Sequence, residues 1–228
     1  MAPVVSPPPP APVKDERSLA IIAEFLAKIG GEDAVRKIES YSVKGIGFMR
    51  VRGTEVDADI EIYRQTPDQY SELIKTNTLG ELRQIYTKNN FLLQTDFGVT
   101  TEMPAGLRST RQELLYPILR LTDKSAFMSL EYAGTFDRQA RKAHVINAKS
   151  ADGEAIALAF DVETKMLVGY AGTYSTYSLD DYQKAQDVLL PFSIDRGSAA
   201  ITIYELKVNT PIDETNFKRK VNCFDTPN

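Results

Sequence analysis

Between Ser40 and Val208 the sequence repeatedly alternates apolar and polar residues, with the period of a β-strand that buries one face. The alternating stretches are interrupted at Gly53, Pro67, Gly80 and the pair Asn89-Asn90. Breaks this short leave no room for the crossovers that join parallel strands. The pattern therefore predicts an antiparallel meander of short strands.

The stretch from Leu189 to Phe217 predicts the last hairpin of this meander. In an extended chain Ile201 and Ile203 would face one side of the sheet, and the residues between them would face the other. Pro211 has no N–H and disfavours a helical residue before it. We therefore expect sheet pairing to end soon after Val208.

Two stretches show helical spacing instead. The first carries an apolar stripe and ends at Gly30 and Gly31, and the stripe consists of Leu19, Ile22, Ala23, Leu26 and Ile29. A short second helix should follow, over about 32–38. The other stretch lies in mid-chain, with Thr110 and Glu113 at capping-box spacing before Leu114, Leu115, Ile118 and Leu119. Pro117 should kink this helix or end its first part.

Together these elements predict a mainly β (α+β) fold. Counting the alternating stretches gives about eleven strands in one open antiparallel sheet. A sheet this wide tends to curl, and helices across one face would leave an apolar space between the layers. We expect a single domain over residues 15–228, preceded by a flexible Pro-rich arm over residues 1–14.

Composition adds few chemical groups to this picture. The formal net charge is -4 and the basic residues are scattered, which gives no reason to expect nucleic acid as a partner. Cys223 is the only cysteine and His144 the only histidine, which we interpret as structural. The tail triplet Lys218, Arg219 and Lys220 is most simply solvated.

No combination of residues predicts catalysis. The sequence contains no Ser-His-Asp arrangement, phosphate loop or metal-ligand spacing, so we expect no enzyme activity, no cofactor and no metal. Asp57, Asp59 and Glu61 alternate with apolar residues. Carboxylates spaced in this way would suit calcium, but a sheet with one wet face produces the same pattern.

The N-terminus "MAPVVSPPPPAPVKDE" lacks the basic and apolar regions of a signal peptide. Its four consecutive prolines favour an extended segment that serves as a spacer or tether, or a leader without a partner. No stretch approaches the roughly 18 apolar residues that span a bilayer.

Several strings resemble the LolA-type lipoprotein carriers and the related outer-membrane lipoprotein-sorting proteins. They are "IGGEDAVRKIESYSVKG" (29–45), "IEIYRQTPDQY" (60–70), "FDVETKMLV" (160–168) and the closing stretch 189–217. The resemblance implies a half-barrel whose concave face is covered by helices, with a pocket for acyl chains. It also implies a bacterial periplasmic or outer-membrane location. The absence of Trp departs from many family members.

The resemblance favours a non-catalytic binding protein whose partner is a lipid or the acyl chains of a lipoprotein. Such a carrier needs only an apolar cavity with a polar rim. The candidate lining residues are Ile60, Ile62, Leu73, Ile85, Phe91, Leu93, Leu115, Ile156, Leu158, Phe160 and Tyr170. The same residues would also suit a filled core. A second hypothesis is an accessory subunit that docks on a larger envelope complex through its surface and its Pro-rich arm.

Overall fold

The structure is a computed structural model of the chain. It describes residues 14–65, 69–87, 90–102, 115–123, 125–138, 141–150, 153–172, 176–197 and 199–220. The predicted arm before Lys14, the capping pair Thr110 and Glu113, and Cys223 lie outside these residues.

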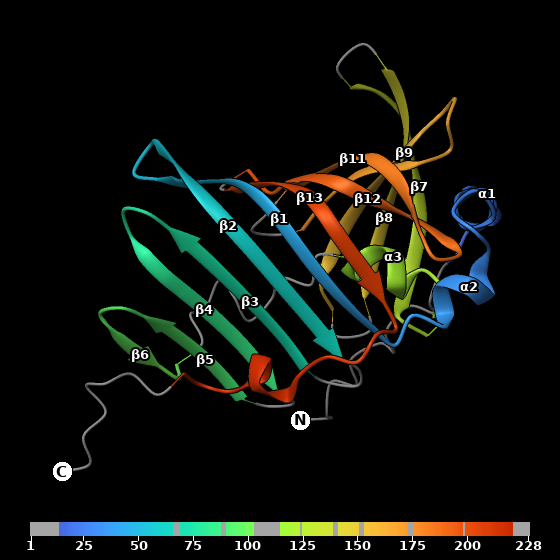
Figure 1. The fold of residues 1–228 in the computed structure, drawn as a ribbon. Helices are drawn as coiled ribbons and strands as arrows, with labels where there is room; N and C mark the ends of the chain where they lie inside the picture. The colour runs from blue at the N-terminus through green and yellow to red at the C-terminus, as the bar shows by residue number, and fades with distance from the viewer. Residues whose placement is uncertain are drawn as a thin grey trace, which may run out of the picture.

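One antiparallel sheet dominates the fold (Figure 1). Its first six strands are β1 (Ser40–Val51), β2 (Thr54–Gln65), β3 (Gln69–Thr76), β4 (Gly80–Thr87), β5 (Asn90–Thr95) and β6 (Gly98–Thr100). The others are β7 (Phe127–Arg138), β8 (Arg141–Ser150), β9 (Ala155–Asp161), β10 (Leu167–Ala171), β11 (Thr176–Ala185), β12 (Val188–Asp195) and β13 (Ala199–Val208). The predicted count of about eleven is therefore wrong, because the described residues already form thirteen strands in this sheet. The prediction missed β6, whose three residues are all exposed and show no alternation.

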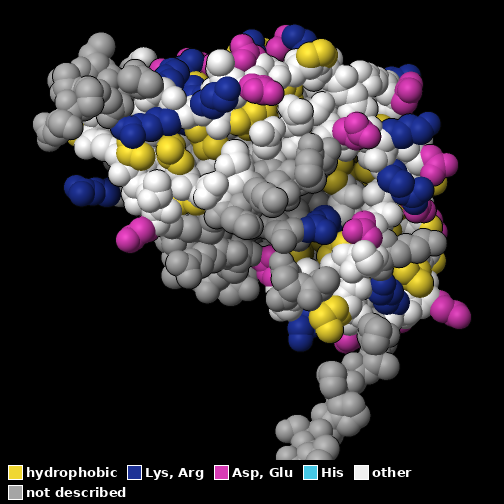
Figure 2. Space-filling model, turned by 90° about the horizontal axis from the view of Figure 1, so that it is seen from below, with side chains coloured by type: hydrophobic (Ala, Val, Ile, Leu, Met, Phe, Trp, Pro, Cys, Tyr) yellow, Lys and Arg dark blue, Asp and Glu magenta, His cyan; other side chains and the backbone are white. Residues whose placement is uncertain are grey.

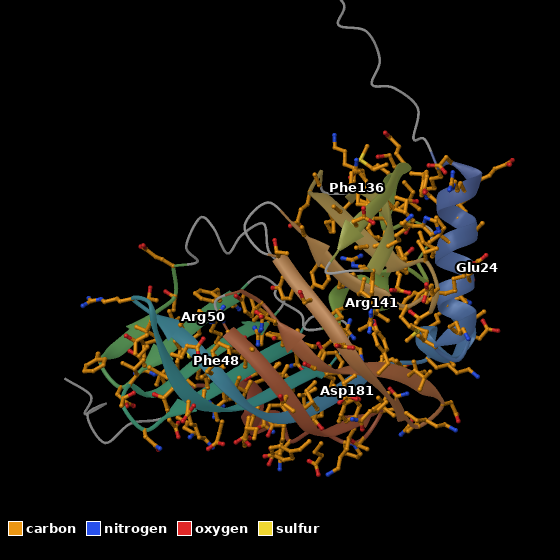
Figure 3. All side chains as sticks on the ribbon, turned by 90° about the horizontal axis from the view of Figure 1, so that it is seen from above. Glu24, Phe48, Arg50, Phe136, Arg141 and Asp181 are labelled. Atoms are coloured by element: carbon orange, nitrogen blue, oxygen red, sulfur yellow. The ribbon has the colours of Figure 1, made fainter. Side chains whose placement is uncertain are left out.

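The strand order is β6-β5-β4-β3-β2-β1-β13-β12-β11-β10-β9-β8-β7. The sheet thus consists of two meanders, β1–β6 and β7–β13, which meet where β1 pairs with β13. The last strand ends at Val208, as its sequence predicts. The sheet is strongly curved, and β2–β5 lie on the opposite side of the molecule from helix α1 (Figures 1 and 3).

Glycine allows the two meanders to approach closely at β1–β13. A Cβ atom on Gly47 would lie 1.8 Å from the carbonyl oxygen of Ala200, and one on Gly45 would lie 2.7 Å from that of Thr202. No side chain larger than hydrogen fits there without a shift of the backbone. The two glycines of β1 therefore set the spacing of this seam.

Within the described ranges the helices are few. They are α1 (Glu16–Lys28), α2 (Glu32–Arg36), α3 (Tyr116–Arg120) and the 3-10 helix η2 (Glu214–Phe217). Helix α3 begins one residue before Pro117, so the proline lies in the first turn and needs no kink. Figure 1 shows α3 within the curve of the sheet and α1 and α2 beside it.

The buried face of α1 is rotated from the predicted stripe. Ile22, Leu26 and the capping residue Ile29 are buried as predicted, but Ser18, Ile21 and Phe25 are buried as well. Leu19 is 45% exposed. The ring of Phe25 packs edge-on against Phe160 of β9, with 5.5 Å between the centroids.

A single apolar core covers one face of the sheet, which we call the inner face. Cross-strand pairing places Val43, Ile62, Ile60 and Ile74 on this face in the first meander. In the second meander it places Tyr177, Tyr170, Leu158 and Ile146 there. The buried side chains of α1 and α3 join the same core, so both helices pack on the inner face.

The outer face is polar and carries the end of the chain. Lys75 pairs with Glu61 at 2.8 Å, and Lys44 pairs with Glu205 at 3.7 Å. Helix η2 packs on β3 and β4 and buries Phe217. Beyond it the backbone of Lys220 exchanges two hydrogen bonds with the Gln94 side chain, of 2.9 and 3.1 Å. Lys218, Arg219 and Lys220 are exposed, as predicted, although the backbone of Lys220 is held on the sheet. On the face seen in Figure 2, basic and acidic side chains are interspersed.

Candidate functional site

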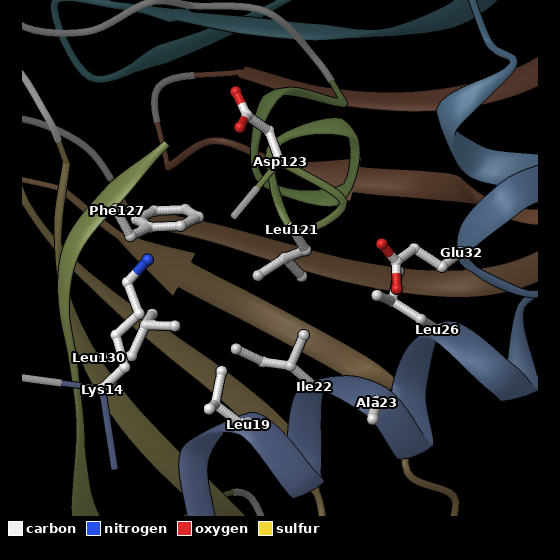
Figure 4. A pocket seen from close by; sticks show the side chains of 10 residues that line it. All are labelled: Lys14, Leu19, Ile22, Ala23, Leu26, Glu32, Leu121, Asp123, Phe127 and Leu130. Atoms are coloured by element: carbon white, nitrogen blue, oxygen red, sulfur yellow. The ribbon is translucent and has the colours of Figure 1, made fainter. Parts of the chain in front are cut away.

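A pocket of about 390 Å³ lies between α1 and the segment that connects α3 to β7. Its walls are mostly apolar, and charged side chains are part of its lining. The lining residues are Lys14, Leu19, Ile22, Ala23, Leu26, Glu32, Leu121, Asp123, Phe127 and Leu130 (Figure 4). Ile22 and Leu121 point toward each other across the space (Figure 4).

The pocket explains why Leu19 and Ala23 of the predicted stripe are exposed. Both lie one turn apart on α1 and face the pocket rather than the core. An exposed leucine costs little by itself, but Leu19 and Ala23 extend the apolar wall begun by the buried Ile22 and Leu26. The helix therefore has two apolar surfaces, one toward the core and one toward the pocket.

Contacts at the start of α1 fix the helix beside β7. The Asp15 carboxylate caps the helix by accepting hydrogen bonds from Ser18 N and Ser18 Oγ, both 2.8 Å. The same carboxylate accepts a 2.6 Å hydrogen bond from Tyr132 N on β7. The Arg17 guanidinium lies 3.7 Å from the centroid of the Tyr132 ring. One wall of the pocket is thereby tied to the sheet.

Burial alone would raise the pKa of Asp15, but the hydrogen bonds from Ser18 and Tyr132 outweigh it and lower the pKa below the ordinary value. The carboxylate is therefore ionised at neutral pH, which is the state that accepts these bonds.

His144 has structural partners. Its Nδ1 atom lies 3.0 Å from the Tyr132 hydroxyl and 3.2 Å from Thr135 Oγ1. Partial burial and the nearby Arg17 charge lower the pKa of His144. It does not line the pocket.

The residues predicted to line a cavity do not line this pocket. Those on the inner face of the sheet are Ile60, Ile62, Phe91, Leu93, Ile156, Leu158, Phe160 and Tyr170. All except Leu93 are buried, and Leu115 joins the same core from the turn before α3. Leu73 pairs with Glu61 and Arg83, and Ile85 pairs with Ser71, so both face the outer side under η2.

The sequence did not predict a buried polar cluster on the inner face. Arg196, which follows β12, donates a 2.5 Å hydrogen bond from Nη2 to Oε1 of Glu72 on β3. Glu72 is 1% exposed and Arg196 11%. Burial alone would lower the pKa of Arg196, but the Glu72 carboxylate outweighs it and raises the pKa.

Tyrosine side chains lie within electrostatic reach of this ion pair. Tyr70 lies two residues before Glu72 on the same face of β3, and its ring centroid is 5.9 Å from that of Tyr86. In the second meander, the rings of Tyr170 and Tyr177 stack with 4.2 Å between their centroids. Burial raises the pKa of both Tyr70 and Tyr170, so both carry their hydroxyl protons at neutral pH.

Within the described ranges, no group of three or more His, Cys, Asp or Glu side chains is arranged to hold a metal ion. Glu61, one of the alternating carboxylates of β2, is occupied by Lys75 and by the Tyr63 hydroxyl at 2.7 Å. None of the helices in the part of the chain that the structure describes is both long and apolar enough to cross a membrane.

Three solved structures share the architecture at low sequence identity. A DUF1329 family protein from Desulfovibrio piger has a TM-score of 0.60 at 8% identity, covering 92% of this chain and 98% of its own. A LolA superfamily protein from Nitrosomonas europaea has a TM-score of 0.57 at 10% identity, covering 88% and 97%. An outer-membrane lipoprotein-sorting protein domain from Vibrio parahaemolyticus has a TM-score of 0.56 at 11% identity, covering 89% and 96%.

No protein-family model matches the sequence, and no curated protein matches it. The structural matches extend over nearly the whole of this chain and of each of the three proteins. The likeness therefore concerns the whole fold, and the chain has a LolA-like fold.

Proposed function

We propose that the chain is a non-catalytic binding protein that holds an acyl chain or a similar lipid-like group between α1 and the sheet. The observation that carries this proposal is the pocket beside α1, whose apolar walls are bordered by Lys14, Glu32 and Asp123. Its volume of about 390 Å³ lies within the range of small-molecule sites, roughly 300–1,000 Å³.

An acyl chain suits this lining for two reasons. Each methylene group that leaves water for an apolar wall contributes about 0.8 kcal/mol, so even a partly enclosed chain gains binding energy. The charged side chains at the border can remain hydrated while they contact a polar head. The LolA-like fold supports the proposal, and one protein that shares it is a lipoprotein-sorting domain.

The inner-face residues predicted from the sequence have a supporting part in this proposal. Phe160 of β9 packs against Phe25 of α1 and so supports the helix that forms one wall of the pocket. Ile60, Ile62 and the other buried members belong to the packed core on the inner face of the sheet. We also propose a location in the bacterial periplasm or at the outer membrane, which the LolA-like fold supports and which cell fractionation tests.

The proposal is tested with a fluorescent fatty-acid analogue and two matched variants. Leu19→Asp puts a carboxylate in the pocket wall, and Leu79→Asp makes the same change at the turn between β3 and β4. The two leucines are 45% and 42% exposed, so both variants should fold. We expect saturable binding to the wild type and to Leu79→Asp, and at least tenfold weaker binding to Leu19→Asp.

Mass spectrometry of the purified protein gives an independent readout, since co-purifying lipid should be present in the wild type. Absence of both lipid and saturable probe binding in the wild type would overturn the proposal. The accessory subunit that docks on an envelope complex would then be the better explanation of the fold.

A further inference from the structure

The single histidine lies on the side of the sheet where α1 packs. His144 of β8 pairs with Thr135 of β7 and with Phe160 of β9, so its side chain is on the inner face beside Phe160. Phe25 of α1 packs on the same Phe160 ring. The imidazole is partly buried there. A change in its charge would therefore be felt between the helix and the sheet.

Three polar atoms meet at the imidazole. The Tyr132 hydroxyl lies 2.8 Å from Thr135 Oγ1 and 3.0 Å from His144 Nδ1, and Thr135 Oγ1 lies 3.2 Å from the same nitrogen. A neutral imidazole with its proton on Nε2 accepts a hydrogen bond at Nδ1 from one of these hydroxyls. After protonation Nδ1 can only donate, so the hydroxyl that donated to it must turn and accept.

Tyr132 connects this group to the first turn of α1. Its backbone N–H donates to the Asp15 carboxylate, and the Arg17 guanidinium lies 3.7 Å from its ring centroid. The His144 ring meets the same tyrosine ring edge-on, with 5.6 Å between the centroids. Asp15 is thus at the backbone end of Tyr132, whereas His144 is at its hydroxyl end. A protonated imidazole would be a second cation beside a ring that already holds Arg17.

Charged groups act on His144 from the elements around it. Arg17 and Glu24 belong to α1, and Lys165 belongs to the turn between β9 and β10. Lys165 pairs with Glu24 at 3.3 Å, so the carboxylate that would attract a protonated imidazole already has a partner. Two cations and one carboxylate therefore face His144, and a further positive charge is unfavourable there.

The pKa of His144 agrees with this geometry. Burial lowers the pKa below the ordinary value of 6.5, Arg17 and Lys165 lower it further, and Glu24 acts in the opposite direction. The imidazole is thus mostly neutral at pH 7 in the folded protein. Its stabilising effect is complete above the unfolded pKa of about 6.5 and is lost as the pH falls through the folded value.

The other end of α1 is held by a separate contact. Leu189 N of β12 donates a 2.8 Å hydrogen bond to the carbonyl oxygen of Ile29. Leu19 and Ala23, which line the pocket, lie between this contact and the attachment at Tyr132. Loss of the Tyr132 attachment would therefore release the first turns of the helix while its C-terminal end stays on β12.

We propose that protonation of His144 releases the first turns of α1 from β7 and thereby opens one wall of the pocket in mild acid. The release itself requires no ligand. Its consequence, weaker binding of an acyl chain at lower pH, rests on the proposed function.

Hydrogen exchange of the backbone amides tests the release without a ligand. After correction for the intrinsic pH dependence of exchange, amides 18–23 should lose about threefold in protection between pH 7.5 and pH 5, a size typical of interactions between partly exposed charges. Amides 26–29 should keep their protection, since the C-terminal end of α1 stays attached. His144 is the only histidine, so no other side chain has its ordinary pKa within this window.

His144→Gln is the matched variant, because glutamine keeps a polar side chain that does not titrate. Its amides 18–23 should have the same protection at both pH values. Equal loss of protection in the wild type and in His144→Gln would overturn the proposal.

Nuclear magnetic resonance of the one imidazole measures its pKa directly. Arg17→Gln should raise the pKa of His144, because it removes a facing cation. The control Arg52→Gln, at the exposed turn between β1 and β2, should leave the pKa unchanged. A pKa of His144 at or above its ordinary value in the wild type would also overturn the proposal.

The consequence for binding is measured with 1-monooleoylglycerol, whose head group does not titrate. Binding to the wild type should be about threefold weaker at pH 5 than at pH 7.5, in step with the exchange, and binding to His144→Gln should be equal at both. Equal binding by the wild type at the two pH values would contradict the opening of the pocket wall. No binding at either pH would be a failure of the proposed function, whereas the exchange comparison decides the release by itself.

Discussion

At the scale of single residues, Asp15 joins a helix cap to a contact between two elements. Its carboxylate accepts hydrogen bonds from Ser18 at the start of α1 and from Tyr132 on β7. The same charge therefore caps the helix and fixes it beside the sheet. Neighbouring Lys14 forms a parallel bridge with Leu130, which also lines the pocket. One ionised side chain therefore contributes to the position of the pocket wall.

Asp15 gives a pH-dependent prediction. Because its pKa is lowered in the folded protein, its contribution is complete above the unfolded pKa of about 3.9 and is lost as pH falls through the folded value. At pH 7 Asp15→Ala should lower the free energy of unfolding by about 1 kcal/mol. Urea unfolding from pH 7 to pH 3 should show this difference shrinking toward the acid end.

The control for this series is Asp57→Ala, which removes an exposed carboxylate from β2. A difference between Asp15→Ala and the wild type that stays constant from pH 7 to pH 3 would contradict the role assigned to the ionised carboxylate.

At the scale of elements, the seam between β1 and β13 is the joint of the sheet. Every other pair of neighbouring strands is consecutive in sequence, so local hairpins suffice to form each meander. The seam instead pairs residues far apart in sequence, such as Lys44 with Glu205. It also contains the two glycines where the backbones come closest.

Gly47→Ala should therefore destabilise the protein by about 2 kcal/mol, because the added methyl group would overlap the Ala200 carbonyl and force a shift of the backbone. Gly172→Ala is the control, since the nearest atom to its Cβ would be Glu154 Oε1 at 3.4 Å. Denaturant unfolding measures both. Equal unfolding midpoints for the two variants would show that the seam accommodates a methyl group, and would contradict this prediction.

Most of these elements could be predicted from the sequence, because the alternation of apolar and polar residues along a strand shows which of its faces is buried. The sequence predicted the end of sheet pairing soon after Val208, a first helix ending at Gly30 and Gly31, and a second helix over about 32–38, where the structure has α1 ending at Lys28 and α2 ending at Arg36. The prediction missed β6, because all three residues of this strand are exposed and none marks a buried face. It misplaced part of the α1 stripe because Leu19 faces a pocket, and an apolar side chain looks the same in sequence whether it lines a pocket or a core.

The candidate site was less predictable than the fold for a related reason. The pocket combines α1 with the start of β7, and the polar cluster combines β3 with the end of β12. Each combination depends on how far the sheet curves, and strand alternation carries no information about curvature. One feature of the sequence could have indicated that Glu72 is buried. It alternates with the apolar residues Tyr70 and Ile74, which share its face of β3.

At the scale of the whole molecule, one core runs across both meanders under the helices. Leu158 is fully buried near the middle of β9. Leu158→Asp would place an unpaired charge in that core. It should lower the free energy of unfolding by several kcal/mol and so unfold the domain. Circular dichroism measures the loss, and Ala157→Asp, on the other face of the same strand, should remain folded.

A Leu158→Asp protein that keeps its spectrum but binds no fatty-acid analogue would contradict this expectation. It would show that the inner face at β9 is a ligand cavity, as the sequence-based list of lining residues proposed, and not a filled core.

The seam also has a consequence for the order of folding. Joining β1 to β13 closes a loop of more than a hundred residues, and the entropic cost of closure precedes any gain from the contacts. The two meanders should therefore form first and dock late. In stopped-flow experiments Gly47→Ala should accelerate unfolding more than it slows refolding, because a late contact is absent from the transition state. The hydrogen-bonded edge of β1 would meanwhile stay open, which makes the undocked meander the species most exposed to pairing with another chain.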